Sequence, residues 1–166
     1  FIARRLVILA SEDIGMADPM SLLVADAAAR AVEFVGLPEA QLNLSQAVIH
    51  LATAPKSNSA LVGLSRARDD VREGRGRRVP PHLRDGHYTG ARDLGHGEGY
   101  IYPHDTETGW VDQQYLPDDM AQVSYYSPSH HGFEAEILQR RRNQRTADSS
   151  PDGALGANRE AKDQKA

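Results

Sequence analysis

Apolar residues recur at helical spacing over most of residues 1–73. This spacing predicts four helices, at about residues 1–10, 19–35, 38–54 and 58–73. The second helix has clear end signals, because Asp18 can cap free N–H groups, Pro19 fits a first turn and Gly36 suits a stop. A fifth helix is predicted at about 131–145. The pattern therefore predicts an all-α fold built as a helical bundle.

The helix at 19–35 is apolar almost all round. Its polar residues Asp26, Arg30 and Glu33 form one narrow stripe. A helix of this kind is expected to be central in its bundle or to face a second subunit. We therefore predict that it carries subunit-interface residues, namely Leu23, Ala27, Ala31 and Phe34.

The other helices have polar and apolar residues on separate predicted faces. In 38–54 the wet face is predicted to hold Glu39, Asn43, Gln46, His50 and Thr53, with Leu42, Ala47, Ile49 and Ala52 largely opposite. In 58–73 the predicted core stripe is Ala60, Leu61, Leu64, Ala67 and Val71, and Ser57 is placed to cap the helix. In 131–145 the residues predicted to be buried are Phe133, Ile137 and Leu138.

Between the fourth and fifth helices the chain is rich in glycine and proline, which cannot continue a helix. We predict that residues 79–118 form an ordered irregular arm that wraps the bundle. Aromatic residues are favoured at the buried centres of interfaces, and Tyr100, Tyr102, Trp110 and Tyr115 are expected both to anchor the arm and to lie in the subunit interface. The pattern also allows a short helix near 87–94 and a small β-hairpin with strands at 100–102 and 110–111.

The stretch 79–105 is crowded with side chains that active sites use, yet it holds no complete motif. A zinc site needs three or four converging ligands, and His-Glu-x-x-His is absent although His82, His87, His96, His104, His130 and His131 are available. Asp and His in loops commonly bind backbone groups and fix turns, so a structural role is favoured. A small metal-dependent hydrolase with its site in 82–105 remains an alternative.

The sequence gives little support for phosphate binding and leaves one candidate segment for DNA binding. The chain lacks the Gly-x-x-x-x-Gly-Lys-Ser/Thr loop that cradles nucleotide phosphates. The net charge of −4 differs from the strongly basic charge that is typical of nucleic-acid-binding domains. Arginines are nevertheless concentrated between Arg66 and Arg84, and a DNA-binding face there remains an alternative, with Arg75, Arg77 and Arg78 as the contacts.

Composition indicates which cross-links the chain can form, which compartment it occupies and which part of it is ordered. Cysteine is absent, which excludes disulfides and thiolate metal ligands. Apolar runs are too short to span a membrane, so we expect a cytoplasmic protein with no membrane partner. Residues 1–145 are predicted to be one helical domain, and 146–166, which have little to bury, a disordered tail. The abrupt helical start without Met suggests a fragment of a longer protein.

Four stretches, taken in order, resemble the C-terminal region of the RarA/MgsA family. They are ASEDIGMADP at 10–19, LATAPKSN at 51–58, the whole of 79–105 and QYLPD at 114–118. Family members are AAA+ ATPases that act at stalled replication forks and are similar to the Werner helicase-interacting protein. The resemblance covers about residues 1–145, and the tail after Arg145 has no counterpart in it.

The resemblance implies a post-AAA+ oligomerisation domain, similar in fold to the collar of clamp loaders, with no catalysis of its own. It implies a homotetramer, and an upstream AAA+ module of the same chain that would carry ATP and Mg, with no cofactor in this fragment. It also implies that the full-length protein is a DNA-dependent ATPase in recombination and repair, with DNA and single-strand-binding protein as partners.

Overall fold

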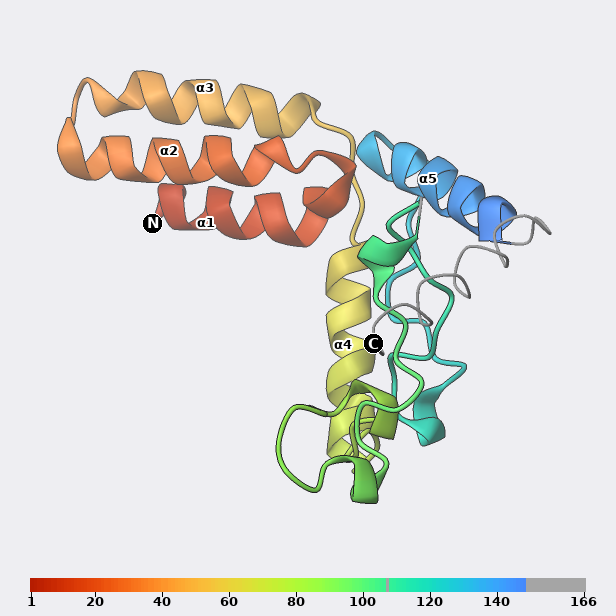
Figure 1. Ribbon diagram of the computed structural model, residues 1–166. Helices are drawn as coiled ribbons and strands as arrows, with labels where there is room; N and C mark the ends of the chain where they lie inside the picture. Colours follow the sequence, from red (N-terminus) through yellow and green to blue (C-terminus); the bar gives the residue numbers. More distant parts are fainter. Residues whose placement is uncertain (107, 149–166) are drawn as a thin grey trace. The chain divides into compact units, whose positions relative to one another are not determined.

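The all-α prediction is confirmed. A computed structural model describes residues 1–106 and 108–148, and within these residues there are helices but no strand (Figure 1). The helices are α1 (Ile2–Leu9), α2 (Met20–Phe34), α3 (Ala40–Thr53), α4 (Ser59–Arg72) and α5 (Phe133–Asp148). Their ends lie within a few residues of the predicted ones, because caps, glycines and prolines stand at the helix ends.

The described chain divides into two compact units. The helical unit comprises residues 1–69 and 124–139, and the arm unit comprises 70–123 with the residues from 140 onwards. Two of the three boundaries lie inside helices, in α4 and in α5, and the third lies between residues 123 and 124. In sequence, the arm unit is therefore an insertion into the helical unit. Whether 1–145 behaves as one domain stays a prediction, and the tail prediction concerns mainly 149–166, outside the described residues.

Alanine dominates the core of the helical unit. Helix α2 lies between α1 and α3 (Figure 1). The buried cluster that joins them consists of Leu6, Ala10, Ile14, Ala25, Ala28, Ala47 and Leu51. Small side chains at the contacts let helix axes approach closely, and the larger Leu6, Ile14 and Leu51 fill the rest of the core.

The connection from α1 to α2 confirms the predicted cap. One π-helical turn, Ala10–Ile14, and one 3₁₀ turn, Gly15–Ala17, follow α1. The Asp18 carboxylate then accepts a hydrogen bond from the backbone N–H of Met20 at 3.2 Å. The Ser57 hydroxyl accepts from the N–H of Ser59 at 3.3 Å, as predicted for the start of α4.

Two predicted helix faces are wrong. On α3 the buried residues are Ala40, Ala47 and Leu51, whereas Leu42 and Ile49, which were expected to be largely inside, are exposed. On α4 only Gly63 is buried, and the predicted stripe with Leu61, Leu64 and Val71 is exposed. On α4 a small residue forms the contact, because the neighbouring backbone comes too close for a larger one. Gly63 illustrates this, since an added Cβ would lie 3.0 Å from the Tyr125 carbonyl oxygen.

The arm unit consists of short turns joined by extended chain. Its 3₁₀ turns are Pro81–Leu83, Arg92–Leu94, Pro103–Asp105 and Asp118–Met120. The helix expected at 87–94 is therefore reduced to its last turn. Each of the first, third and fourth turns begins at or just after a proline, which has the backbone angle that a helical first turn requires.

The predicted hairpin is absent from the described residues. Ile101 of the first predicted strand instead pairs through its backbone with the side-chain amide of Gln113, which lies two residues beyond the second predicted strand. Gln113 Nε2 donates to the Ile101 carbonyl oxygen at 2.8 Å, and the Ile101 N–H donates to Gln113 Oε1 at 3.3 Å. A glutamine side chain therefore replaces the backbone ladder that a hairpin would form.

Position 132 requires glycine, because its backbone packs against the connection between α1 and α2. Gly132 has φ +52°, and an added Cβ would lie 2.1 Å from the Ala17 carbonyl oxygen. We predict that Gly132→Ala lowers the free energy of unfolding by about 3 kcal/mol or more, combining left-handed strain of about 1–2 kcal/mol with overpacking. Urea denaturation followed by circular dichroism measures this.

Gly36→Ala is the matched control, because Gly36 also has positive φ, +78°, but an added Cβ would have no heavy atom within 4 Å. It should lose only the backbone term, about 1 kcal/mol. Equal losses in the two variants would contradict the close contact at Gly132.

Candidate functional site

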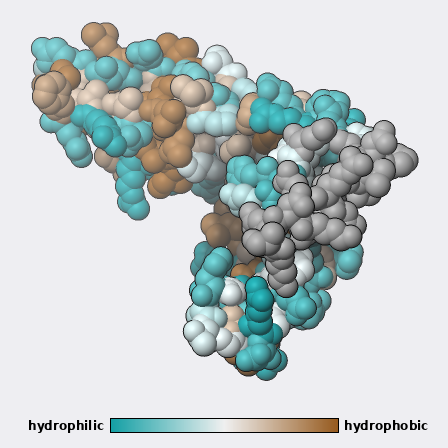
Figure 2. Space-filling model, viewed as in Figure 1, coloured by the Kyte–Doolittle hydropathy of each residue, from teal (hydrophilic) through white to brown (hydrophobic). Residues whose placement is uncertain are grey.

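The predicted interface residues lie along one stripe of α2. Phe34 is 92% exposed and Leu23 is 60% exposed, Ala27 is also exposed, and Ala31 is half-buried. Helix α3 adds Leu42 and Ile49, with 77% and 62% exposure. Apolar side chains are visible on the surface of this bundle in Figure 2. Exposed apolar groups on this scale are typical of a surface that binds a partner.

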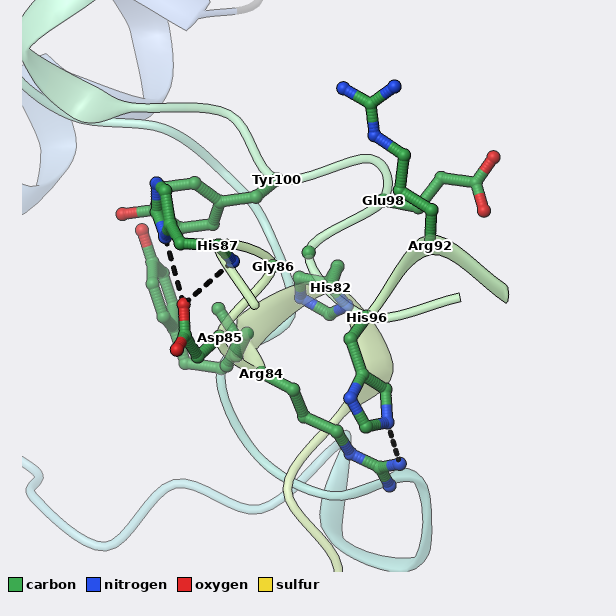
Figure 3. Close-up of a pocket in the computed structure, with 12 residues that line it drawn as sticks. His82, Arg84, Asp85, Gly86, His87, Arg92, His96, Glu98 and Tyr100 are labelled. Atoms are coloured by element: carbon green, nitrogen blue, oxygen red, sulfur yellow. Dashed lines mark hydrogen bonds and ion pairs between the residues drawn. The ribbon is translucent and has the colours of Figure 1, made fainter. Parts of the chain in front are cut away.

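The arm unit contains an open cleft with a volume of about 1020 Å³ (Figure 3). All of its lining residues lie between positions 82 and 115. They are His82, Leu83, Arg84, Asp85, Gly86, His87, Arg92, His96, Gly97, Glu98, Tyr100 and Tyr115. The cleft therefore gathers most of the chemistry-bearing residues that the sequence showed in 79–105.

Two loops form the cleft by touching at glycines. The Gly97 N–H donates to the Pro81 carbonyl oxygen at 2.9 Å. Gly97 has φ +74°, and an added Cβ would lie 3.2 Å from the Cα of Gly86. Any side chain at Gly97 would thus push the two loops apart and change the shape of the cleft.

His96 is held in one tautomer. Arg84 Nη1, which can only donate, lies 3.0 Å from His96 Nε2, so Nε2 carries the lone pair. His96 Nδ1 lies 2.7 Å from the Tyr88 hydroxyl and must then carry the proton. Both ring nitrogens are used internally, which leaves His96 as a structural element of the wall and not as a general base.

Asp85 and His87 form a small turn at the rim. The Asp85 carboxylate accepts from the backbone N–H of His87 at 2.9 Å and pairs with His87 Nδ1 at 2.8 Å. These hydrogen bonds, first from the backbone and then from the ring, hold the pKa of Asp85 below its ordinary value. Both side chains are exposed, so the pair fixes loop shape while remaining accessible.

The histidines do not form a metal centre in the described part of the chain. His82 Nε2 lies 2.7 Å from the Gln114 carbonyl oxygen, and His104 packs its ring against Tyr102. Across residues 1–106 and 108–148 no group of three or more His, Cys, Asp or Glu side chains could hold a metal ion. In particular, His96, His104 and Asp105 do not form such a group, and the metal-dependent hydrolase gains no support.

The four predicted aromatic anchors are not buried together. Tyr100 and Tyr115 line the cleft with 44% and 50% exposure, and Tyr102 is about as exposed. Trp110 is half-buried, and its carbonyl oxygen accepts from the hydroxyl groups of Thr106 and Thr108, both at 3.2 Å. The three tyrosines are therefore surface residues of the arm, available for contact.

One grouping resembles a catalytic triad but has the wrong geometry. Asp18, Ser21 and His50 meet between the start of α2 and α3, where His50 was predicted to be solvated. His50 Nε2 lies 2.9 Å from Asp18 Oδ2 and 3.2 Å from Ser21 Oγ, so one nitrogen faces both partners and cannot relay a proton between them. Burial by itself raises the pKa of Asp18, but hydrogen bonds from Ser21, His50 and the Met20 N–H lower it overall.

Glu134 is a buried carboxylate that the sequence reasoning missed. It lies in the first turn of α5, and its side chain is fully buried. Tyr126 donates to it at 2.9 Å, the Ser129 N–H donates at 2.7 Å, and Ser59 donates from α4. Burial by itself raises the pKa of Glu134, but the hydrogen bonds from Ser129, Ser59 and Ser57 outweigh it and lower the pKa to about 2.

The predicted DNA-contact arginines differ in their surroundings. Arg75 is used internally, since Nη1 pairs with Asp70 at 2.6 Å and Nη2 donates to the Asp119 carbonyl oxygen at 3.0 Å. Arg77 and Arg78 are exposed. Of the three, Arg75 therefore holds the arm unit together, and only the other two present their charge to solvent.

Comparison with known proteins identifies an AAA+-associated helical domain. The family model for the MgsA AAA+ ATPase C terminal matches residues 1–145. The chain therefore belongs to the MgsA AAA+ ATPase C-terminal family. The same match covers α1 to α4, the arm and most of α5.

Curated relatives agree with this assignment. An uncharacterized AAA domain-containing protein of Mycobacterium tuberculosis is 57% identical over 140 residues, covering 84% of this chain and 31% of the relative. Replication-associated recombination protein A of Bacillus subtilis is 48% identical over 139 residues, covering 83% and 33%. ATPase WRNIP1 of Dictyostelium discoideum is 39% identical over 127 residues, covering 76% and 14%. The chain thus spans about a third or less of the length of these relatives.

The Glu134 network makes a pH-dependent contribution to stability. Because the folded pKa of about 2 lies below the ordinary 4.5, the contribution is complete above pH 4.5 and is lost as pH falls towards 2. We predict that Glu134→Gln lowers the free energy of unfolding by roughly 3 kcal/mol at pH 7. Urea titrations between pH 7 and pH 3 should show the difference from wild type shrinking with acid.

Glu33→Gln is the control, since Glu33 lies on α2 in the same unit with an exposed side chain. It should change stability little at any of these pH values. A Glu134→Gln variant as stable as Glu33→Gln at pH 7 would contradict the role of the network.

Proposed function

We propose that this chain is the oligomerisation domain of a DNA-dependent AAA+ ATPase that acts at stalled replication forks in recombination and repair. One observation carries the proposal, namely the apolar surface on α2 and α3 of the helical unit. In this reading the chain has no catalysis and no cofactor of its own, and an upstream AAA+ module binds ATP and Mg.

The distribution of side-chain sizes supports the proposal. The core is largely alanine, whereas Leu23, Phe34, Leu42 and Ile49 are exposed. Large apolar side chains contribute most when they are removed from water, at about 25 cal/mol per Å². Placing them outside and alanines inside favours a second apolar surface as their partner. A second copy of the same chain supplies such a surface by symmetry.

The mechanism would be positional. Joining several ATPase modules raises their effective concentration for one another and sets their spacing on DNA. The expected assembly is a homotetramer, with DNA and single-strand-binding protein as partners of the full-length protein in the cytoplasm. The relatives named for replication-associated recombination support this context. No helix in the described part of the chain is long and apolar enough to cross a membrane.

Light scattering after size exclusion tests the proposal. We expect the wild-type chain at tens of micromolar to have the mass of an oligomer, and Leu23→Asp with Phe34→Asp to reduce it to a monomer, because a desolvated carboxylate opposes association. Leu94→Asp is the matched control: Leu94 is an exposed leucine in the arm unit, and its variant should keep the oligomer. A wild-type chain that is strictly monomeric would overturn the proposal.

DNA binding by the arginine-rich segment is a second candidate, favoured by the exposure of Arg77 and Arg78. Reversing both charges should weaken binding to single-stranded or forked DNA and reduce its salt dependence. Fluorescence anisotropy at several salt concentrations measures this. Arg75 is left intact because its reversal would break the contact with Asp70.

The matched control reverses Arg4 and Arg5, two exposed arginines on α1. If both double variants weaken binding equally, the effect is one of net charge and the segment has no special role.

A further inference from the structure

We propose that the cleft of the arm unit binds a base of single-stranded nucleic acid, held between the rings of its wall. The proposal goes beyond oligomerisation and concerns a different surface. It rests on three properties of the cleft: unused hydrogen-bonding groups, exposed aromatic faces and balanced charge.

The cleft has unused donors and acceptors together. Arg84 Nε donates to the Val79 carbonyl oxygen and Nη1 donates to His96, whereas Nη2 has no partner among the described residues. His82 donates Nε2–H to Gln114, which leaves Nδ1 as an acceptor. Asp85 uses Oδ1 for His87, whereas Oδ2 has no partner in the described chain. A ligand that offers both donors and acceptors at its edge fits this set, as a nucleobase does.

The walls are planar rather than aliphatic. Tyr100 and Tyr115 are 44% and 50% exposed, and three histidine rings and the guanidinium groups of Arg84 and Arg92 add further flat faces. Among the lining residues, Leu83 is the only one with an aliphatic side chain. An apolar peptide anchor would find little to pack against, whereas bases stack on such faces irrespective of their sequence.

Charge argues for a base rather than a phosphate inside the cleft. Arg84 and Arg92 are balanced by Asp85 and Glu98. A bare phosphate would therefore meet two carboxylates together with the two cations. A neutral heterocycle meets no such opposition, and the phosphates attached to it can stay outside the cleft.

The cleft is also preformed. The Gly97 N–H bond to Pro81 and the close approach of Gly97 to Gly86 join its two loops. The Arg84–His96–Tyr88 chain of hydrogen bonds ties one wall to the other loop. A ligand therefore need not order the loops on binding, which removes an entropic cost. Figure 3 shows His87 and Tyr100 close to Asp85 on one side, and Arg84 with His96 on the other.

The test uses the full chain and two oligonucleotides of equal phosphate number, one of thymidines and one with abasic sites throughout. Fluorescence anisotropy should show binding of the thymidine oligomer at least about fivefold tighter than binding of the abasic one. Tyr100→Ala with Tyr115→Ala should remove this difference, whereas Tyr100→Phe with Tyr115→Phe should keep most of it.

Tyr102→Ala is the control, because Tyr102 is as exposed as these two but lies outside the cleft, with its ring against His104. It should leave the preference unchanged. Equal affinity for both oligomers, no binding of either, or an equal loss in Tyr102→Ala would overturn the proposal. Light scattering on the same variants keeps this result separate from oligomerisation, since removing the tyrosines should not change the mass.

Discussion

The close packing of α1, α2 and α3 on alanine is the constraint from which the rest of the helical unit follows. Ala25, Ala28 and Ala47 lie at the contacts between the helices, and Leu6, Ile14 and Leu51 are the few large side chains buried among them. Many other large apolar side chains, among them Leu23, Phe34, Leu42 and Ile49, are exposed. The helical unit therefore has small side chains at many of its internal contacts and large apolar ones on its surface.

The two units are organised by different forces. The helical unit depends on apolar contact, supplemented by the satisfied carboxylate of Glu134, which links the start of α5 to the start of α4. The arm unit has little apolar core and depends on side-chain-to-backbone hydrogen bonds, of which Gln113 to Ile101 and Arg84 to Val79 are examples. Polar residues that looked catalytic in the sequence are therefore mostly used to give irregular chain a fixed shape.

Helix positions could be predicted from the sequence because their signals are local. Asp18 and Ser57 cap the helices that they precede, and glycine or proline stands at most ends. Burial could not be predicted in the same way, since a hydrophobic pattern takes large apolar residues as the buried ones, and here Leu42 and Ile49 lie outside while Ala47 lies inside. Glu134 was missed because an acid in a first turn already suits the helix dipole. Nothing local reveals that Ser59, 75 positions earlier, binds it.

This separation in the chain has a consequence for the order of assembly. Glu134 and Tyr126 belong to the helical unit, yet the whole arm lies between them and α4. During synthesis α1, α2 and α3 can pack as soon as they emerge. The hydrogen bond between Glu134 and Ser59 at the start of α4 can form only after the arm has been made. The length of the arm enters the closure entropy only logarithmically, so a longer arm would cost the helical unit little, whereas the loss of one hydrogen bond to Glu134 would cost it directly.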